Sequence, residues 1–119
     1  MKQKVIVCDD DDEILDITAF ILEDAGYDVI KVPESVKVID TITETNPALV
    51  ILDLWMPGMS GDEVVIALRK NDQLKHTNVI IISASRDGKQ TAMQAGADQF
   101  IAKPYDLEHL VAEVRKFAR

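Results

Sequence analysis

Short apolar runs alternate along the whole chain with longer segments in which apolar residues recur at helical spacing. Residues 5–8 (Val-Ile-Val-Cys) and 79–82 (Val-Ile-Ile-Ile) are the clearest of these runs. A continuous apolar run of this length, bounded by polar or turn residues, is typical of a strand buried on both faces of a sheet. The strands predicted in this way are residues 5–8, 28–32, 49–52, 79–82 and 99–102.

The segments between the runs have the spacing of amphipathic helices. Asp11 or Asp12 is a suitable N-cap for the first helix, and Gly26 follows its last turn. The predicted helices are residues 12–25, 33–46, 62–70, 90–95 and 106–117. The side chains predicted to point inward are Val36, Ile39 and Ile42 in the second helix, and Leu107, Leu110, Val111, Val114 and Phe117 in the last.

This alternation predicts an α/β fold, in which right-handed crossovers join a parallel sheet that has helices on both faces. The chain of 119 residues has the length of one domain, so residues 1–119 are expected to form a single unit. The composition, 47% hydrophobic and 29% charged, is that of a globular protein with a packed core.

The net charge of −8 argues against binding to nucleic acid or to anionic membranes. The nearest approach to a basic cluster is Arg115, Lys116 and Arg119, which lies where the C-terminal end of a helix favours positive charge. Cys8 is the only cysteine, which fits a reducing cytosol. Because no apolar stretch approaches the length of a membrane span, a cytoplasmic location is expected.

Chemically active side chains follow four of the five predicted strands. Asp9 and Asp10 follow the first, Asp53 the third, Ser83 the fourth and Lys103 the fifth. The carboxyl ends of parallel strands meet at one edge of a sheet, where ligands of open α/β folds bind. Three carboxylates, a hydroxyl and an ammonium group are therefore predicted to converge there.

Such a cluster of carboxylates favours a bound cation. Two carboxylates about 4 Å apart repel each other by roughly 4 kcal/mol at an effective dielectric constant near 20. Carboxylate oxygens suit Mg²⁺, and Mn²⁺ as a substitute. The cation would make the central carboxylate a usable nucleophile toward a phosphoryl donor, while Lys103 and Ser83 could contact the phosphoryl oxygens.

Four motifs carry a resemblance to a known family. They are Asp9-Asp10, the run Asp-Leu-Trp-Met-Pro-Gly-Met-Ser-Gly that begins at Asp53, Ser83-Ala84, and residues 96–104 (Gly-Ala-Asp-Gln-Phe-Ile-Ala-Lys-Pro). In this spaced combination they resemble the receiver domain of bacterial two-component response regulators, over essentially the whole chain. The resemblance implies a flavodoxin-like three-layer sandwich with strand order 2-1-3-4-5.

The resemblance also assigns roles to the metal-binding residues. It implies that Asp53 is the phosphoacceptor and that Asp10, Asp53 and the backbone carbonyl of Trp55 bind Mg²⁺. Asp9 would act through metal-bound water. The side chain of Trp55 is bulky for a position two residues after the acceptor, so it is expected to affect access to the site.

Three further residues complete the implied switch. Ser83 and Lys103 would contact the phosphoryl oxygens, and the rotamer of Phe100 would be coupled to the hydroxyl of Ser83. The implied function is a regulatory phosphoacceptor domain that assists its own phosphorylation and slow dephosphorylation, rather than a classical enzyme. The implied phosphoryl donors are a histidine kinase, a histidine phosphotransfer protein and small acyl phosphates. An output domain, a downstream protein and a second copy of the chain are candidate partners.

Two alternatives remain at this point. Residues 83–103 form a segment about two residues shorter than the family pattern, which predicts a shortened fourth helix and leaves the output face open. One alternative is therefore a receiver-like interaction module that is inert to phosphorylation. The other is a small hydrolase with an aspartyl-phosphate intermediate, which would need an acid or base where Trp55 stands.

Overall fold

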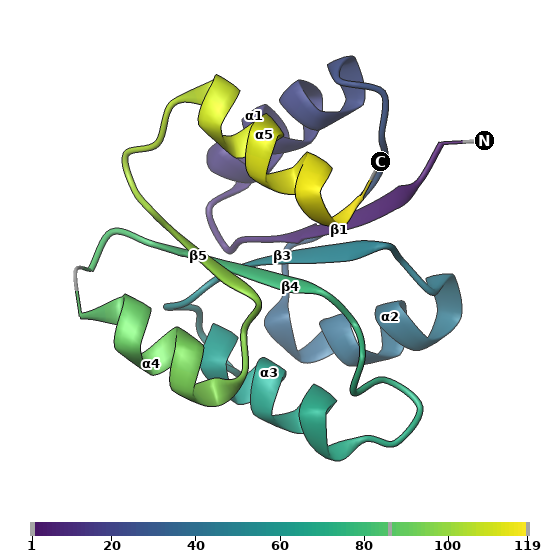
Figure 1. Ribbon diagram of the computed structural model, residues 1–119, viewed down its shortest axis with the longest axis vertical. Helices are drawn as coiled ribbons and strands as arrows, with labels where there is room; N and C mark the ends of the chain where they lie inside the picture. Colours follow the sequence, from purple (N-terminus) through teal and green to yellow (C-terminus); the bar gives the residue numbers. More distant parts are fainter. Residues whose placement is uncertain (1, 86, 119) are drawn as a thin grey trace.

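The computed structural model describes residues 2–85 and 87–118. Its centre is a five-stranded sheet in the order β2-β1-β3-β4-β5, in which every neighbouring pair is parallel (Figure 1). The strands are β1 (Lys4–Cys8), β2 (Asp28–Val32), β3 (Leu49–Asp53), β4 (Val79–Ser83) and β5 (Gln99–Ala102). The predicted fold class and strand order are confirmed.

Helices cover both faces of the sheet. In Figure 1, α1 and α5 lie on one side, and α2, α3 and α4 lie on the other. The helices are α1 (Asp12–Asp24), α2 (Val38–Thr45), α3 (Gly61–Lys70), α4 (Gly88–Ala95) and α5 (Leu107–Phe117), with a 3-10 turn, η1 (Ser35–Lys37), before α2. None of the helices in the described part of the chain is long and apolar enough to cross a membrane.

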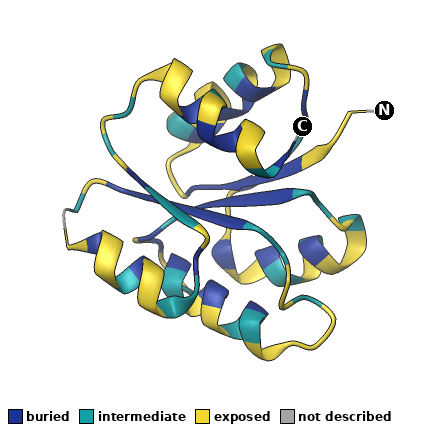
Figure 2. Ribbon diagram, in the orientation of Figure 1, coloured by how far each residue is buried: buried dark blue, intermediate teal, exposed yellow. Residues whose placement is uncertain are grey.

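The strands supply the core of both layers. Alternate residues such as Val7 and Ile51 face α1 and α5, whereas Cys8 and Leu52 face α2, α3 and α4. In Figure 2 the strands are mostly buried, and the exposed residues lie largely on the outer sides of the helices. A sheet buried on both faces explains why its strands read as continuous apolar runs in the sequence.

Local signals set the ends of the helices. The side chain of Asp11 accepts hydrogen bonds from the backbone N–H groups of Glu13 and Ile14, at 3.0 and 3.2 Å, and so caps α1. The predicted capping role of Asp11 is confirmed. The fourth helix begins two residues earlier than predicted, at Gly88 rather than residue 90, and its eight residues make it shorter than α1, α3 and α5.

Two predicted inward positions are wrong. Val36 is 56% exposed, because residues 35–37 form a 3-10 turn in which Ser35 rather than Val36 is buried. Leu107 is 52% exposed, since it is the first residue of α5 and lines the groove between α1 and α5. On α5 the buried polar residue is Glu113, which accepts a hydrogen bond from the side chain of Gln99 at 3.3 Å.

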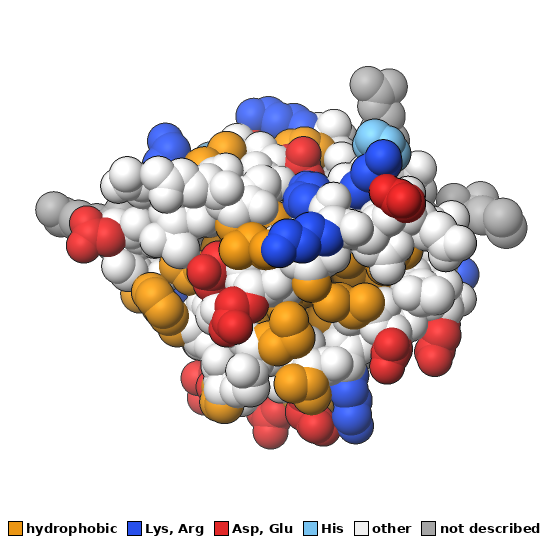
Figure 3. All heavy atoms as spheres, turned by 90° about the horizontal axis from the view of Figure 1, so that it is seen from below, with side chains coloured by type: hydrophobic (Ala, Val, Ile, Leu, Met, Phe, Trp, Pro, Cys, Tyr) orange, Lys and Arg blue, Asp and Glu red, His pale blue; other side chains and the backbone are white. Residues whose placement is uncertain are grey.

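The outer face of the layer formed by α2, α3 and α4 is seen directly in Figure 3. Hydrophobic, acidic and basic side chains are intermixed on it. Ile66 on α3 and Met93 on α4 are among the exposed hydrophobic residues of these helices.

Candidate functional site

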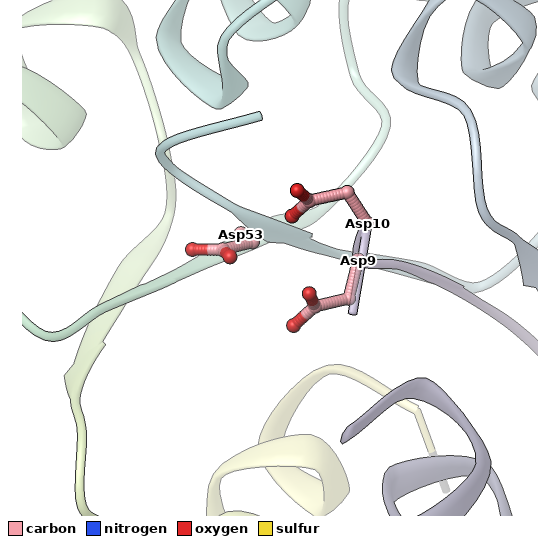
Figure 4. Close-up of side chains that lie close together, drawn as sticks. All are labelled: Asp9, Asp10 and Asp53. Carbon is pink, nitrogen blue, oxygen red and sulfur yellow. The ribbon is translucent and has the colours of Figure 1, made fainter. Parts of the chain in front are cut away.

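Three carboxylates meet at the carboxyl edge of the sheet. Asp9 and Asp10 directly follow β1, and Asp53 ends the adjacent strand β3. Each can offer one oxygen such that all three oxygens lie within 4.8 Å of one another. Figure 4 shows the side chains of Asp9 and Asp10 diverging from the end of β1, with Asp53 beside them. The predicted convergence of these carboxylates is therefore present.

The three carboxylates differ in their exposure to water. Asp9 is buried, Asp53 is partly buried, and Asp10 is exposed. One carboxylate oxygen of Asp9 accepts a hydrogen bond from the backbone N–H of Asp11 at 3.0 Å, which orients the side chain. The cluster thus has a fixed inner member and an outer member open to solvent.

Lys103 lies opposite this cluster, just after β5. Its Nζ is 3.5 Å from Oδ2 of Asp9 and 3.5 Å from Oδ2 of Asp53. The backbone N–H of Lys103 donates to the carbonyl of Ser83 at 2.9 Å, so the ends of β4 and β5 hold the lysine in place. Its ammonium group supplies one positive charge between two of the carboxylates.

The charges and the burial shift two pKa values. Burial raises the pKa of Asp53 above the usual 3.8; Lys103 and the backbone N–H of Trp55 lower it, and the charge of Asp9 raises it further. Burial alone would lower the pKa of Lys103, but the carboxylates of Asp53 and Asp9 outweigh burial and raise it. The lysine is therefore protonated at neutral pH. Ionisation of Asp53 is less favourable here than that of a carboxyl group in water.

Ser83 lies at the end of β4 and is fully buried. Its Oγ accepts a hydrogen bond from the backbone N–H of Ser85 at 3.1 Å, and within residues 2–85 and 87–118 its own O–H has no acceptor, so the proton can be donated to a ligand. Phe100 is partly buried on the neighbouring strand β5. A Cβ added to Gly88 would lie 3.2 Å from both Ser83 Cβ and Phe100 Cε1, so the first turn of α4 packs closely against both residues.

The loop from Leu54 to Ser60 brings Trp55 to the rim of the site. Leu54 is fully buried, donates its backbone N–H to the carbonyl of Ile82 at 2.9 Å and accepts from Gly61 at 2.8 Å. A Cβ on Gly61 would lie 2.6 Å from the carbonyl oxygen of Asp53, so only glycine lets α3 begin this close to the strand. The side chain of Trp55 is 60% exposed.

The donor set fits a hard divalent cation. Carboxylate oxygens with room for water and a phosphate oxygen suit Mg²⁺. Cys8, the nearest soft ligand, is buried in the core, where burial and the charges of Asp9, Asp10 and Asp53 raise its pKa to about 12. It therefore stays a thiol, and the oxygen ligands define the chemistry of the site.

Sequence reasoning misses one contact to the loop that carries Trp55. The hydroxyl of Ser35, in η1, donates to the carbonyl of Pro57 and accepts from the backbone N–H of Met59, at 3.0 Å in each case. These residues are more than 20 positions apart, and no local pattern pairs them.

Comparison with known proteins places this arrangement in a family. The family model described as the response regulator receiver domain matches residues 5–115. The chemotaxis response regulator CheY4 of Vibrio cholerae is similar, with 27% sequence identity, a TM-score of 0.90, and coverage of 98% of this chain and 99% of that one. The receiver domain of the Francisella response regulator 1452 is 29% identical, with a TM-score of 0.89 and coverage of 98% and 96%.

A third similar structure is the signal receiver domain of a putative Luxo repressor protein from Vibrio parahaemolyticus. It is 30% identical, with a TM-score of 0.88 and coverage of 98% of this chain and 90% of that one. The fold, the acidic cluster and these likenesses agree, and the chain belongs to the response regulator receiver domain family.

Proposed function

We propose that this chain is a phosphorylation-dependent switch in which Asp53 accepts a phosphoryl group from a histidine kinase or a histidine phosphotransfer protein. The observation that carries the proposal is the cluster of Asp9, Asp10 and Asp53 with Lys103 set against it. Receiver domains take part in two-component phosphoryl-transfer signalling, and the acidic pocket fits a site of phosphorylation. Residues 1–119 would act as one receiver domain.

Asp10, Asp53 and the backbone carbonyl of Trp55 would hold Mg²⁺, with Asp9 acting through a bound water. A cation held there would offset the repulsion among the carboxylates and the charge on the phosphoryl oxygens during transfer.

The reaction itself needs little from the protein beyond position and charge. A carboxylate oxygen of Asp53 attacks phosphorus in line with the bond to the donor's imidazole nitrogen. The new P–O bond forms as the P–N bond breaks, and the electron pair leaves with the imidazole. Lys103, already 3.5 Å from Asp53, then contacts a phosphoryl oxygen as a fixed positive charge.

Ser83 would convert the new group into a change of shape. Its free O–H proton can be donated to a phosphoryl oxygen, and movement of the serine would disturb the close packing of Gly88 and Phe100 against it. Shifting an equilibrium from 1:99 to 99:1 requires about 5.5 kcal/mol. Two charge-assisted hydrogen bonds, at roughly 1.5–3 kcal/mol each, supply most of that.

The surface beside Lys103 suits a protein donor. Ile14, Ile17 and Leu107 line an apolar groove between α1 and the start of α5, and Lys103 and Tyr105 also line it. Ile17 is among the exposed large hydrophobic residues of the described chain. A helix of a donor protein seated in this groove would lie next to the acceptor site.

Intact mass measurement tests the proposal. The protein is incubated with acetyl phosphate in the presence and absence of Mg²⁺, and release of inorganic phosphate is followed in parallel. We expect the mass of one phosphoryl group to be added only with Mg²⁺, to be absent in Asp53→Asn, and to persist in the control Asp40→Asn, which changes an exposed carboxylate on α2.

The same experiment separates the alternatives. Absence of any adduct in the wild type would favour the inert interaction module. Sustained phosphate release without an accumulating adduct would favour the hydrolase.

A further inference from the structure

The loop between β3 and α3 is anchored on both sides of Trp55. On the N-terminal side, Leu54 is held by its backbone bonds to Ile82 and Gly61. On the C-terminal side, Met56 is buried, and its Sδ lies 3.6 Å from Sγ of Cys8. The ring of Trp55 is exposed and makes no hydrogen bond to the described residues, so the path of the backbone through Trp55 depends on these neighbours and on the bond from its own N–H to Asp53.

The third anchor is the hydroxyl of Ser35. It donates to the carbonyl of Pro57 and accepts from the N–H of Met59, at 3.0 Å in each case. One side chain thus binds the backbone groups on both sides of Gly58, which has a left-handed φ of +87°. A Cβ on Gly58 would lie 3.0 Å from Cγ1 of Val36, so the turn rests directly on η1.

Ser35 is placed to act on the site. It is 2% exposed and begins η1, shortly after the carboxyl end of β2. That end lies beside the end of β1, where Cys8 pairs with Val32 and Asp9 follows. Ser35 therefore connects the segment after β2, at the carboxyl edge of the sheet, to the loop between β3 and α3.

Fixing Pro57 and Met59 restricts the preceding peptide groups. The carbonyl of Trp55 belongs to the planar peptide that joins Trp55 to Met56, so its direction follows from the backbone angles of those two residues. With Leu54 and Met56 held in the core, and Pro57 and Met59 held by Ser35, that carbonyl has little freedom to turn. Without the serine, Met56 and the bond from Gly61 to Leu54 would still hold the two ends of this segment, but the turn at Gly58 between them would lose both of its hydrogen bonds to η1.

We propose that Ser35 is a positioning residue for the divalent cation, because it holds the loop that presents the Trp55 carbonyl to the site. This inference rests on the proposed function. Groups that orient metal ligands typically contribute 10–100-fold to metal affinity. A purely structural serine would change thermal stability without selectively changing the affinity for the metal.

The test is a calorimetric Mg²⁺ titration of Ser35→Ala. We expect about tenfold weaker binding than in the wild type, at the lower end of the range for such groups. The Mg²⁺ concentration that half-saturates the rate of phosphorylation by acetyl phosphate should rise by the same factor. The rate at saturating Mg²⁺ should change little, because bound metal restores the loop.

Tyr27→Phe is the matched control. The hydroxyl of Tyr27 is also buried and donates to a backbone carbonyl, that of Ala118, but Tyr27 precedes β2 and lies at the opposite edge of the sheet. The control should lose stability and keep wild-type Mg²⁺ affinity. If Ser35→Ala does not fold, Ser35→Cys retains the shape with a much weaker hydrogen-bonding group and takes its place.

The outcomes are distinguishable. Wild-type affinity in the folded Ser35 variant overturns the inference, and so does an equal loss of affinity in Tyr27→Phe. A wild type that takes up no Mg²⁺ would instead refute the proposed function on which the inference rests.

Discussion

Asp53 is a carboxyl group that the fold makes reluctant to ionise. Burial raises its pKa, and the charge of Asp9 raises it further, against the opposing effect of Lys103. The proposed attack on phosphorus needs the ionised form, so the protein would hold a charge that is unfavourable until a cation or a phosphoryl group binds. The proposed function and the stability of the fold therefore oppose each other at this residue.

Asp53→Asn should stabilise the metal-free protein at neutral pH. A raised pKa means that the folded state binds a proton more tightly than the unfolded state, so stability falls as pH rises from the usual 3.8 toward the pKa of the folded state. The penalty is fully present above both values, and Asn, which cannot ionise, escapes it. Thermal unfolding in EDTA should show a higher Tm for Asp53→Asn near pH 7.

The difference in Tm should shrink as the pH is lowered and vanish once Asp53 is protonated in both states. Saturating Mg²⁺ should also reduce the difference in Tm, because metal binding should stabilise the folded wild type more than the variant, which lacks one carboxylate ligand. A lower Tm for the variant at neutral pH would mean that the attraction of Lys103, 3.5 Å away, outweighs the burial of the carboxylate.

At the scale of elements, Arg69 joins the C-terminal end of α3 to two loops. Its guanidinium donates to the carbonyls of Gly96, Lys75 and Thr77, at 2.9, 3.0 and 2.6 Å. It also pairs at 3.0 Å with Asp98, whose carboxylate accepts the N–H of Val79. The end of α4 and the start of β4 are thereby fixed at the edge of the sheet opposite the site.

Removing this connection should loosen the end of α4 locally. We expect Arg69→Ala to lower the free energy of unfolding by about 2–3 kcal/mol, the cost of losing several charge-assisted bonds in a partly buried place. Hydrogen exchange should increase at residues 77–79 and 96–98. Arg69→Lys should recover little, because an ammonium group lacks the planar fork that serves several carbonyls at once.

Lys70→Ala is the control for this change, since Lys70 is the exposed neighbour at the end of the same helix. It should leave both stability and exchange near wild type. A stability change of similar size in the two variants would show that the effect belongs to the helix end rather than to the guanidinium contacts.

The strands and helices also show which features of the fold could be predicted from the sequence. All five strands were predictable to within one residue at either end, because a sheet buried on both faces imposes an unbroken apolar run. Asp9, Asp10, Asp53 and Lys103 were predictable because the ends of parallel strands share one edge. Helix starts were less predictable, as the exposed side chains of Val36 and Leu107 show.

The contacts of Ser35 and Arg69 could not be predicted for a different reason. Each joins side chain to backbone across distant parts of the chain, and the partner is a carbonyl or an N–H that every residue possesses. Such a bond leaves no pattern of residue types. Only the packed geometry shows which backbone groups are within reach.

At the scale of the whole molecule, the two ends of the sheet differ: one carries the candidate site, and the other is fixed by side-chain hydrogen bonds. One edge carries the carboxylates, Ser83 and Lys103, which the proposed phosphoryl group would draw together. The other edge is held by Arg69 and by the bond from Tyr27 to Ala118. Helix α4 spans both, since it begins against Ser83 and Phe100 and ends beside Arg69. If the proposed phosphorylation occurs, we therefore expect it to move the start of this helix more than its end.

Lys103→Ala should separate phosphorylation from that change. The variant retains Asp53 and the proposed metal ligands, so it should still accept a phosphoryl group from acetyl phosphate, though more slowly. It lacks the charge that would pull the end of β5 toward the new group, and a phosphoryl group cannot shift an equilibrium between two states that it contacts equally. Hydrogen exchange across residues 83–102 is the readout, compared before and after phosphorylation.

In the wild type, exchange in α4 and around Phe100 should change on phosphorylation; in Lys103→Ala the change should be largely absent at an equal extent of modification. Lys31→Ala, which removes an exposed lysine paired with Asp16 on the surface, should behave as the wild type. If phosphorylated Lys103→Ala showed the full exchange response, the lysine would serve only the chemistry. We would then expect the coupling to run through Ser83, which ends the neighbouring strand β4.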